Sequence, residues 1–279
     1  MALSSGNNKE KNPTFGILFL AIFIDLLGFG IIIPLLPFMV NLFNADDFGG
    51  EGIAYAWILA VYSLAQFAVA PFWGRLSDRI GRRPVILIGL LGSSISFGYF
   101  AFTETFYSIL FSRALAGFFT AASLPAARAY IADITPRKDR AKKFGLLGAA
   151  FGLGFTFGPV IGGLLAKISI ANLATHAEPG FFAAGMSLVN FMLAYRNLPE
   201  SLTDEIKLMN QSVKSKSQFH VLREAFSIEG IAVLIIVFAI TTFIFSGFEA
   251  IFSLFLIFLD SDLDEKDIGL IFGMLGIIV

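Results

Sequence analysis

The stretch Gly74-Arg75-Leu76-Ser77-Asp78-Arg79-Ile80-Gly81-Arg82-Arg83 decides how this chain can fold. It holds four arginines and one aspartate, and a long apolar run lies on each side of it, at about 53–73 and 84–102. A helix needs roughly 20 apolar residues to cross a hydrocarbon core about 30 Å thick, and both runs are close to that length. We therefore interpret the stretch as a short polar connection between two membrane-spanning helices.

Similar apolar runs recur along the rest of the chain. Of its 279 residues, 56% are hydrophobic and only 15% are charged, whereas a soluble domain carries about 25% charged residues. This composition excludes a disordered chain, a basic nucleic-acid binder and an ordinary cytosolic enzyme. The chain has no Cys, which excludes disulfides, a thiol nucleophile and thiolate metal sites. We predict an all-α polytopic membrane protein with spans at about 15–43, 53–73, 84–102, 106–132, 144–166, 179–198 and 230–259, and an incomplete span from about 268.

The positions of Lys and Arg predict the orientation of these spans. Sixteen of the 20 Lys and Arg residues lie in the N-terminal tail and in every second connection after it. The intervening connections hold only Lys167 and Lys266. Because connections rich in Lys and Arg stay on the cytoplasmic side, we expect a cytoplasmic N-terminus and a multi-pass protein of the cell membrane.

One long polar connection divides the spans into two sets. We predict a cytoplasmic tail at 1–14, a six-helix bundle at 15–198, a cytoplasmic linker at 199–229 and the start of a second bundle at 230–279. Two complete halves would need roughly 400 residues, and a final run of 12 residues gives only about 18 Å of helix. The length therefore predicts that much of the second set of helices is missing, and it leaves open whether such a chain is active.

Two motifs carry a family resemblance. Glycines in the quoted stretch permit a tight turn, and Asp78 can neutralise neighbouring arginines. The order of glycine, aspartate and arginine resembles the signature loop of the major facilitator superfamily. The resemblance implies a cytoplasmic charge network that includes Asp133 and breaks and re-forms as access alternates. The residues of this predicted gating loop are Gly74, Asp78, Arg79, Gly81, Arg82, Arg83 and Asp133.

The second motif is a run of spaced glycines at 145–163. Glycines four residues apart line one helix face and let a neighbouring backbone approach closely. Ordinary packing of small residues accounts for Gly154 and Gly158, but not for the whole run with Gly-Pro inside it. The run resembles the antiporter motif of the same superfamily. The first span adds Asp25, then Gly28-Phe29-Gly30, Pro34 and Pro37. Together these residues resemble the tetracycline/multidrug:proton antiporter branch of the superfamily. The motif residues are Gly145, Gly154, Gly158, Pro159, Gly162 and Gly163.

Ionisable residues inside the spans are the candidates for proton coupling, because a buried charge is costly in a membrane. Counted from the ends of their spans, Asp25 and Arg113 fall at similar depth. We expect Asp25 to bind a proton, with Arg113 favouring its ionised form. The alternative is a static ion pair that fixes helix packing. Glu249 in the seventh span is either a further proton or substrate site or a solvated residue near the outer end.

These features together predict a secondary active transporter rather than an enzyme. We expect it to export a small amphiphilic molecule in exchange for protons by alternating access of two halves. The alternatives are a proton symporter for a sugar or organic acid, and a transporter-like receptor that moves nothing. The expected partners are a small-molecule substrate, protons and the lipid bilayer. We predict a monomer with no metal, no cofactor and no nucleic-acid partner.

Overall fold

The computed structural model describes residues 11–168, 176–202, 218–228 and 230–278. Helices account for nearly all of these residues, and no strand occurs among them. The prediction of an all-α chain is therefore confirmed. The long helices are α1 (Lys11–Ile32), α3 (Glu51–Ile80), α4 (Arg82–Phe100), α5 (Phe106–Ile134), α6 (Arg137–Ala166), α7 (Ala177–Asn197), α10 (Ile231–Leu259) and α11 (Glu265–Ile278).

Short elements connect the first two long helices and precede α10. After α1 the chain continues through η1 (Ile33–Leu35), α2 (Leu36–Met39), η2 (Val40–Leu42) and η3 (Ala45–Phe48). The predicted polar linker contains a ten-residue helix, α9 (Gln218–Ser227). Residues 203–217 of that linker lie outside the described part of the chain.

The chain divides into two compact units. The first contains residues 1–203 and 263–279, and the second contains residues 204–262. Helix α11, predicted as the start of an eighth span, therefore belongs with the six N-terminal helices, and it contacts α6 and, less extensively, η1. Helices α9 and α10 form the second unit and contact each other. The domain boundaries at 199 and 229 stay predictions.

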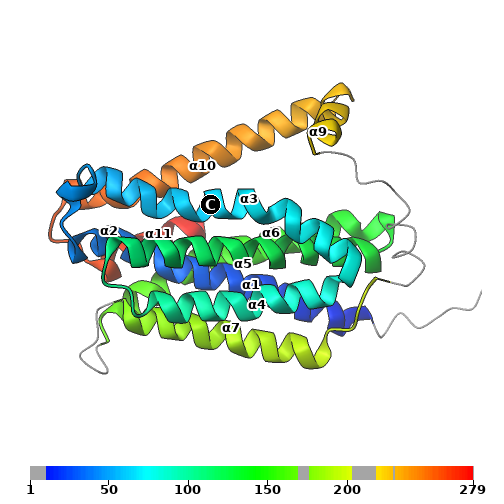
Figure 1. Ribbon diagram of the computed structural model, residues 1–279, viewed down its shortest axis with the longest axis horizontal. Helices are drawn as coiled ribbons and strands as arrows, with labels where there is room; N and C mark the ends of the chain where they lie inside the picture. The colour runs from blue at the N-terminus through cyan, green and yellow to red at the C-terminus, as the bar shows by residue number, and fades with distance from the viewer. Residues whose placement is uncertain (1–10, 169–175, 203–217, 229, 279) are drawn as a thin grey trace, which may run out of the picture. The chain divides into compact units, whose positions relative to one another are not determined.

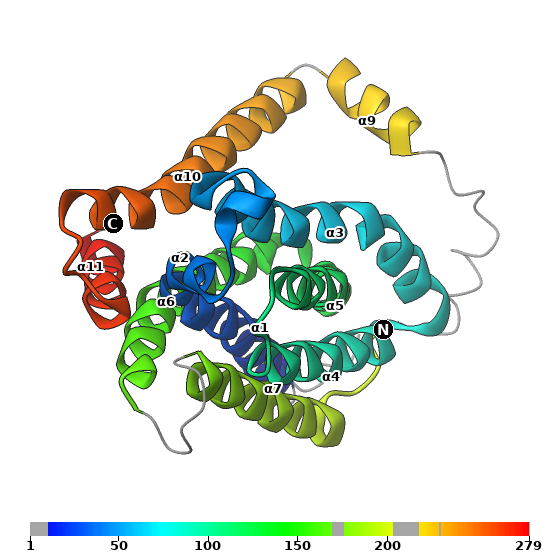
Figure 2. The ribbon, with the colours of Figure 1, turned by 60° about the vertical axis from the view of Figure 1, so that its left-hand side comes forward.

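In the first unit, helices α1, α3, α4, α5, α6 and α7 run side by side (Figure 1). Helix α5 packs between α3 and α4, while α1 packs against α6 and α7. Figure 2 shows the same arrangement from a second direction, with α5 enclosed by its neighbours. The largest buried side chains of this unit include Tyr130, Phe100 and Leu90.

Polar contacts help to hold helix α7 in the bundle. Six helices in the described chain are long and apolar enough to cross a membrane, and α7 is not one of them. Two polar side chains of its buried face reach carbonyls on neighbouring helices. Ser187 Oγ donates to the Leu90 carbonyl at 3.0 Å, and Asn190 Nδ2 donates to the Ala21 carbonyl at 2.9 Å. Such hydrogen bonds between helices stabilise packing inside a membrane.

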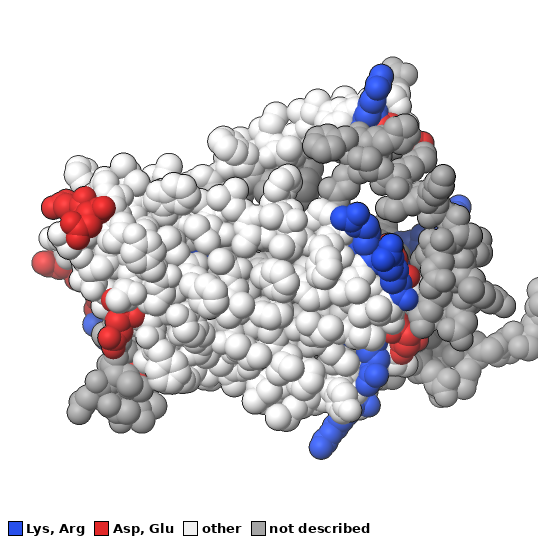
Figure 3. Space-filling model, in the orientation of Figure 1, with Lys and Arg blue, Asp and Glu red and all other residues white. Residues whose placement is uncertain are grey.

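Several helices extend beyond the apolar runs that predicted them, and this corrects the predicted loop at 74–83. Helix α3 continues to Ile80 and α4 begins at Arg82, so only Gly81 lies between them. Its φ of +118° is a left-handed conformation that glycine adopts without strain. Most residues of the signature stretch are therefore helical. Figure 3 shows Lys and Arg gathered at the end of the bundle where α3 meets α4, and Asp and Glu at the opposite end. We call these the basic end and the acidic end.

Candidate functional site

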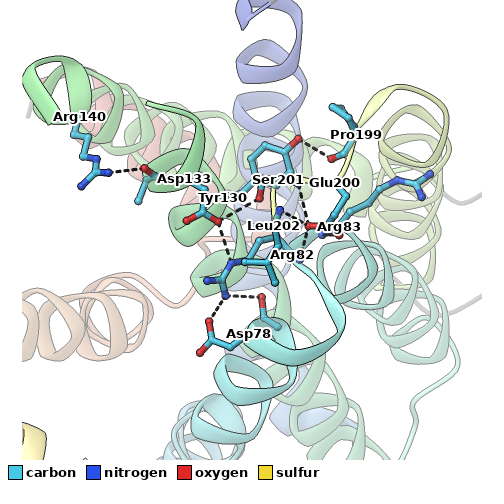
Figure 4. A network of polar contacts seen from close by, with 12 residues as sticks. Asp78, Arg82, Arg83, Tyr130, Asp133, Arg140, Pro199, Glu200, Ser201 and Leu202 are labelled. Atoms are coloured by element: carbon cyan, nitrogen blue, oxygen red, sulfur yellow. Dashed lines mark hydrogen bonds and ion pairs between the residues drawn. The ribbon is translucent and has the colours of Figure 1, made fainter. Parts of the chain in front are cut away.

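Arg82 is the centre of a charge network at the basic end (Figure 4). Its guanidinium lies 2.6 Å from Asp78 on α3 and 3.2 Å from Asp133 on α5. It also donates to Ser77 Oγ at 3.1 Å. The Arg82 side chain is only 10% exposed and that of Asp133 is 19% exposed, whereas the Asp78 side chain is 49% exposed, so the contact with Asp133 is the better shielded from water. The structure thus brings together Asp78, Arg82 and Asp133, as the sequence predicted.

Glu200 caps the first turn of α4 from a segment far away in the sequence. Its carboxylate accepts hydrogen bonds from the backbone N–H groups of Arg82 and Arg83, at 2.9 and 3.1 Å. It also accepts from the N–H groups of Ser201 and Leu202, both at 3.0 Å. A carboxylate at a helix N-terminus satisfies free donors and interacts favourably with the helix dipole. Glu200 therefore fixes the chain after α7 onto the start of α4.

Gly81 leaves room for this cap. A Cβ at Gly81 would collide with the Glu200 carboxyl group, so any larger residue would displace the cap as well as strain the backbone. The predicted turn at Gly81 is confirmed, and its reason is the fit of Glu200.

Two further contacts connect the network to α5 and α7. The Tyr130 hydroxyl donates to the Pro199 carbonyl at 2.7 Å. Arg83 donates to the Tyr195 carbonyl at 2.7 Å and lies over the Tyr195 ring. The network thus joins the basic ends of α3, α4, α5 and α7, all of which belong to the first unit.

Two predicted members of this loop lie apart from the network. Gly74 is inside α3, and no atom lies within 4 Å of the place where its Cβ would be. The expected close helix approach at Gly74 is therefore wrong, because the turn comes seven residues later. Arg79 is exposed and makes no hydrogen bond or ion pair with the described part of the chain.

The spaced glycines of α6 bring its backbone against α1. A Cβ at Gly158 would lie 2.7 Å from the Cα of Gly30, and one at Gly154 would lie 2.9 Å from Leu26 Cβ. At Gly162 it would collide with the Ile31 carbonyl oxygen. The predicted close approach is confirmed for these three glycines.

A second face of the same glycine run packs against α11. The Cβ positions of Gly163 and Gly269 point at backbone carbonyls of the opposite helix, those of Glu265 and Pro159 respectively. Gly145 has open space around it, so packing gives no reason for a glycine there. Helix α6 therefore touches α1 and α11 through backbone atoms on two neighbouring faces.

Asp25 lies inside the bundle on α1. The residue is 7% exposed, and one of its oxygens accepts a hydrogen bond from Ser123 Oγ at 3.1 Å. The other oxygen, Oδ1, is buried and has no hydrogen-bond partner in the described chain. The hydroxyl of Ser93 also lies beside this carboxyl group. A buried carboxylate that meets hydroxyl groups but no positive charge is costly to keep ionised.

Arg113 lies elsewhere, and this corrects the expected neighbourhood. It is 2% exposed, and its guanidinium stacks over the Phe100 ring at 4.9 Å. Ser123, the partner of Asp25, follows Arg113 by ten residues on α5, which is about 15 Å along the helix. Arg113 and Asp25 are therefore not at the same depth, and no ion pair joins them within the described residues. Counting from the helix end failed because α5, with 29 residues, is longer than a membrane core is thick.

The chain matches the family model described as Major Facilitator Superfamily over residues 18–279. It belongs to the Major Facilitator Superfamily. This family is one of transporters, so the prediction that the chain is not an enzyme is confirmed. The apolar helices and the family together make it a multi-pass membrane protein.

Several members of this superfamily are similar in sequence. The chain is 41% identical over 187 residues to the class C tetracycline resistance protein of Escherichia coli, covering 67% of this chain and 45% of that protein. It is 36% identical over 249 residues to multidrug resistance protein 1 of Bacillus subtilis (strain 168), covering 88% of this chain and 59% of that protein. The chain thus spans about half the length of the curated relatives it matches.

A solved structure agrees on the fold. The crystal structure of the human organic anion transporter MFSD10 (TETRAN) superposes with a TM-score of 0.71 at 23% identity, covering 97% of this chain and 70% of that one. At this identity the likeness is one of fold. It confirms the major-facilitator-like arrangement predicted from the sequence.

Sequence reasoning missed three residues of this superfamily member's site. Ser123 and Tyr130 gave no signal, because their partners lie 98 and 69 residues away. Glu200 carried a weak signal, because it is an acidic residue just after the span predicted at 179–198, in a connection rich in Lys and Arg.

Glu249 lies on α10, in the second unit. Thr242, Ser246 and Ser253 share its helix face, because they stand at intervals of three and four residues from one another or from Glu249. The helix is otherwise strongly apolar. These three residues and Glu249 form a polar stripe on an otherwise apolar helix. A role of Glu249 in binding a proton or substrate stays a prediction.

Asp133→Asn is expected to weaken the basic end, because it removes the charge facing Arg82 and weakens the contact with Ser201. We expect a loss of about 1–2 kcal/mol of stability. Thermal unfolding of the purified protein in detergent measures it. The matched control is Asp139→Asn, because Asp139 is exposed at the same end and has no ion-pair partner in the described chain. An equal loss in both variants contradicts the network.

A histidine at the acidic end predicts a pH dependence of stability. Burial lowers the pKa of His176 below its ordinary value of about 6.5, although nearby Glu104 and Glu178 act in the other direction. The ring packs edge-on against Phe100, whose own face carries Arg113. Below about pH 6.5 the unfolded chain binds a proton that the folded chain resists, so stability falls as the pH falls.

His176→Phe tests this, because phenylalanine keeps a ring beside Phe100 and cannot bind a proton. Between pH 7.5 and pH 5.5 we expect the unfolding temperature to fall further in the native chain than in the variant. Equal falls refute a role for His176.

Proposed function

We propose that this protein is a secondary active transporter that exports a small, drug-like amphiphile in exchange for protons. The names of its relatives support this proposal, since they are tetracycline and multidrug resistance proteins. We propose further that the protein acts as a monomer in the cell membrane. Its N-terminus and basic end would face the cytoplasm, as the distribution of Lys and Arg favours.

The observation that carries the proposal is the buried carboxylate of Asp25. Ser123 donates a hydrogen bond to it, Ser93 is a second hydroxyl beside it, and no basic side chain forms an ion pair with it within the described residues. In such a place a carboxyl group can be neutralised by a proton or by a cationic group of a substrate, but not by both at once. Mutually exclusive occupancy of one site couples the two fluxes.

The glycine contacts of α6 supply a surface along which helices can shift. Backbones that meet through glycines lack interlocked side chains, so small displacements cost little. Helix α6 has such contacts with α1, which carries Asp25, and with α11. In this proposal the Asp78–Arg82–Asp133 network stabilises one access state and opens in the other.

Proteoliposomes with an imposed pH gradient test the proposed function. An antiporter concentrates tetracycline or ethidium in vesicles that are acidic inside, because protons leave as the compound enters. A symporter concentrates its substrate only when the outside is acidic, and a receptor binds the compound without flux. Accumulation in vesicles that are acidic inside is the expected result. Uptake only with acid outside, or binding alone, contradicts the proposal.

A further inference from the structure

The four arginines around the α3–α4 junction divide into two pairs. Arg82 and Arg83 are engaged in the charge network. Arg75 and Arg79 are exposed on α3. The Nε of Arg75 donates to the Pro71 carbonyl at 3.2 Å, and Arg79 has no partner among the described residues. The nearest acid in sequence, Asp78, pairs with Arg82. Two positive charges at the basic end are therefore not neutralised by the described chain.

These two arginines line a hollow on the surface of α3. Phe72 and Leu76 complete its lining. The four residues share one helix face, because they are spaced by three and four positions. The hollow has a volume of about 190 Å³, which is smaller than the roughly 300 Å³ at which pockets for drug-sized ligands begin. It fits a single small group rather than a transported molecule.

The order of the lining residues matches an amphiphile. Arg79 is one residue from the end of α3, and Arg75 lies one turn further into the helix. Phe72 lies further still toward the middle of the helix and is 51% exposed. Arg79 is thus nearest the basic end and Phe72 is nearest the membrane interior, with Leu76 and Arg75 next to each other between them. A free phosphate would satisfy the arginines but would leave Phe72 uncovered.

We propose that this face of α3 binds an anionic phospholipid of the leaflet at the basic end. Its phosphate would contact Arg75 and Arg79, since a guanidinium offers paired donors that suit phosphate oxygens. Its acyl chain would lie along Phe72 and Leu76. Clusters of basic residues at a membrane surface attract anionic lipids by about 1 kcal/mol per residue. The proposal is independent of what the protein transports.

Native mass spectrometry of the purified chain tests the site. The protein is held in mixed micelles with equal amounts of dioleoyl-phosphatidylglycerol and dioleoyl-phosphatidylcholine, and the retained lipids are counted. We expect a preference of roughly 30-fold for phosphatidylglycerol, which corresponds to about 1 kcal/mol for each of the two arginines. In the double variant Arg75→Gln, Arg79→Gln this preference should disappear.

The matched control is Lys138→Gln, Lys142→Gln. These lysines also stand one turn apart and are exposed at the basic end, on α6, so both double variants lose two positive charges. The control should keep the preference. If both double variants lose the preference for phosphatidylglycerol, or if neither does, Arg75 and Arg79 do not form a specific lipid site on α3. Displacement of the lipid by millimolar glycerol 3-phosphate overturns the lipid as occupant. A native preference below twofold overturns the proposal without reference to any variant.

Discussion

Gly162→Ala is expected to destabilise the bundle by about 2–3 kcal/mol, although alanine is the better helix former. The added Cβ would collide with the Ile31 carbonyl oxygen of α1. Because the obstacle is backbone rather than a flexible side chain, α1 and α6 would have to move apart. That movement would also disturb the contacts of Gly154 and Gly158 on the same face. The unfolding temperature and the yield of monodisperse protein measure the loss.

Gly148→Ala on the same helix is the matched control. No atom lies within 4 Å of its Cβ position. Replacing glycine by alanine there should stabilise the helix by up to about 1 kcal/mol. The two variants make the same chemical change, but we expect Gly162→Ala to lower the stability of the protein and Gly148→Ala to raise it. Stabilisation by both variants contradicts the close α1–α6 packing.

Asp25→Asn is expected to abolish accumulation driven by a pH gradient. Asparagine keeps the shape of the side chain and an oxygen that can accept from Ser123, but it cannot take up or release a proton in the working range of pH. Exchange of labelled for unlabelled compound needs no net proton movement, so it should persist. Accumulation is measured in empty vesicles with a pH gradient. Exchange is measured as uptake of labelled compound, without a gradient, into vesicles that were loaded with unlabelled compound.

Ser123→Ala is the control for this prediction. It removes the hydrogen bond to Asp25 and leaves the carboxyl group in place. We expect gradient-driven accumulation to continue in this variant. If Asp25→Asn still concentrates the compound, Asp25 is not the proton carrier.

Much of the fold could be predicted from the sequence, because apolar runs of membrane length are an unambiguous signal. The run at 179–198 predicted α7 correctly even though polar residues on its buried face lower its hydropathy. The ends of the helices were less predictable. Helices α3 and α6 continue through charged residues that hydropathy assigns to connections.

The site was only partly predictable for a different physical reason. Spacing along one helix predicted the glycine faces of α6, because that pattern depends only on helix geometry. The relation of Asp25 to Arg113 depends on how far each helix extends beyond the membrane and how it tilts, which a sequence does not encode locally. The Glu200 cap joins groups 118 residues apart, and only the folded bundle brings them together.

The measurement that tests the central claim most directly is proton release on substrate binding. Tetracycline or ethidium is added to the detergent-solubilised protein in weakly buffered solution, and a pH-sensitive dye records the change. If drug and proton compete for Asp25, the native chain acidifies the solution and Asp25→Asn does not. Binding of the compound without acidification by the native chain, or equal acidification by the variant, contradicts proton-coupled export through Asp25.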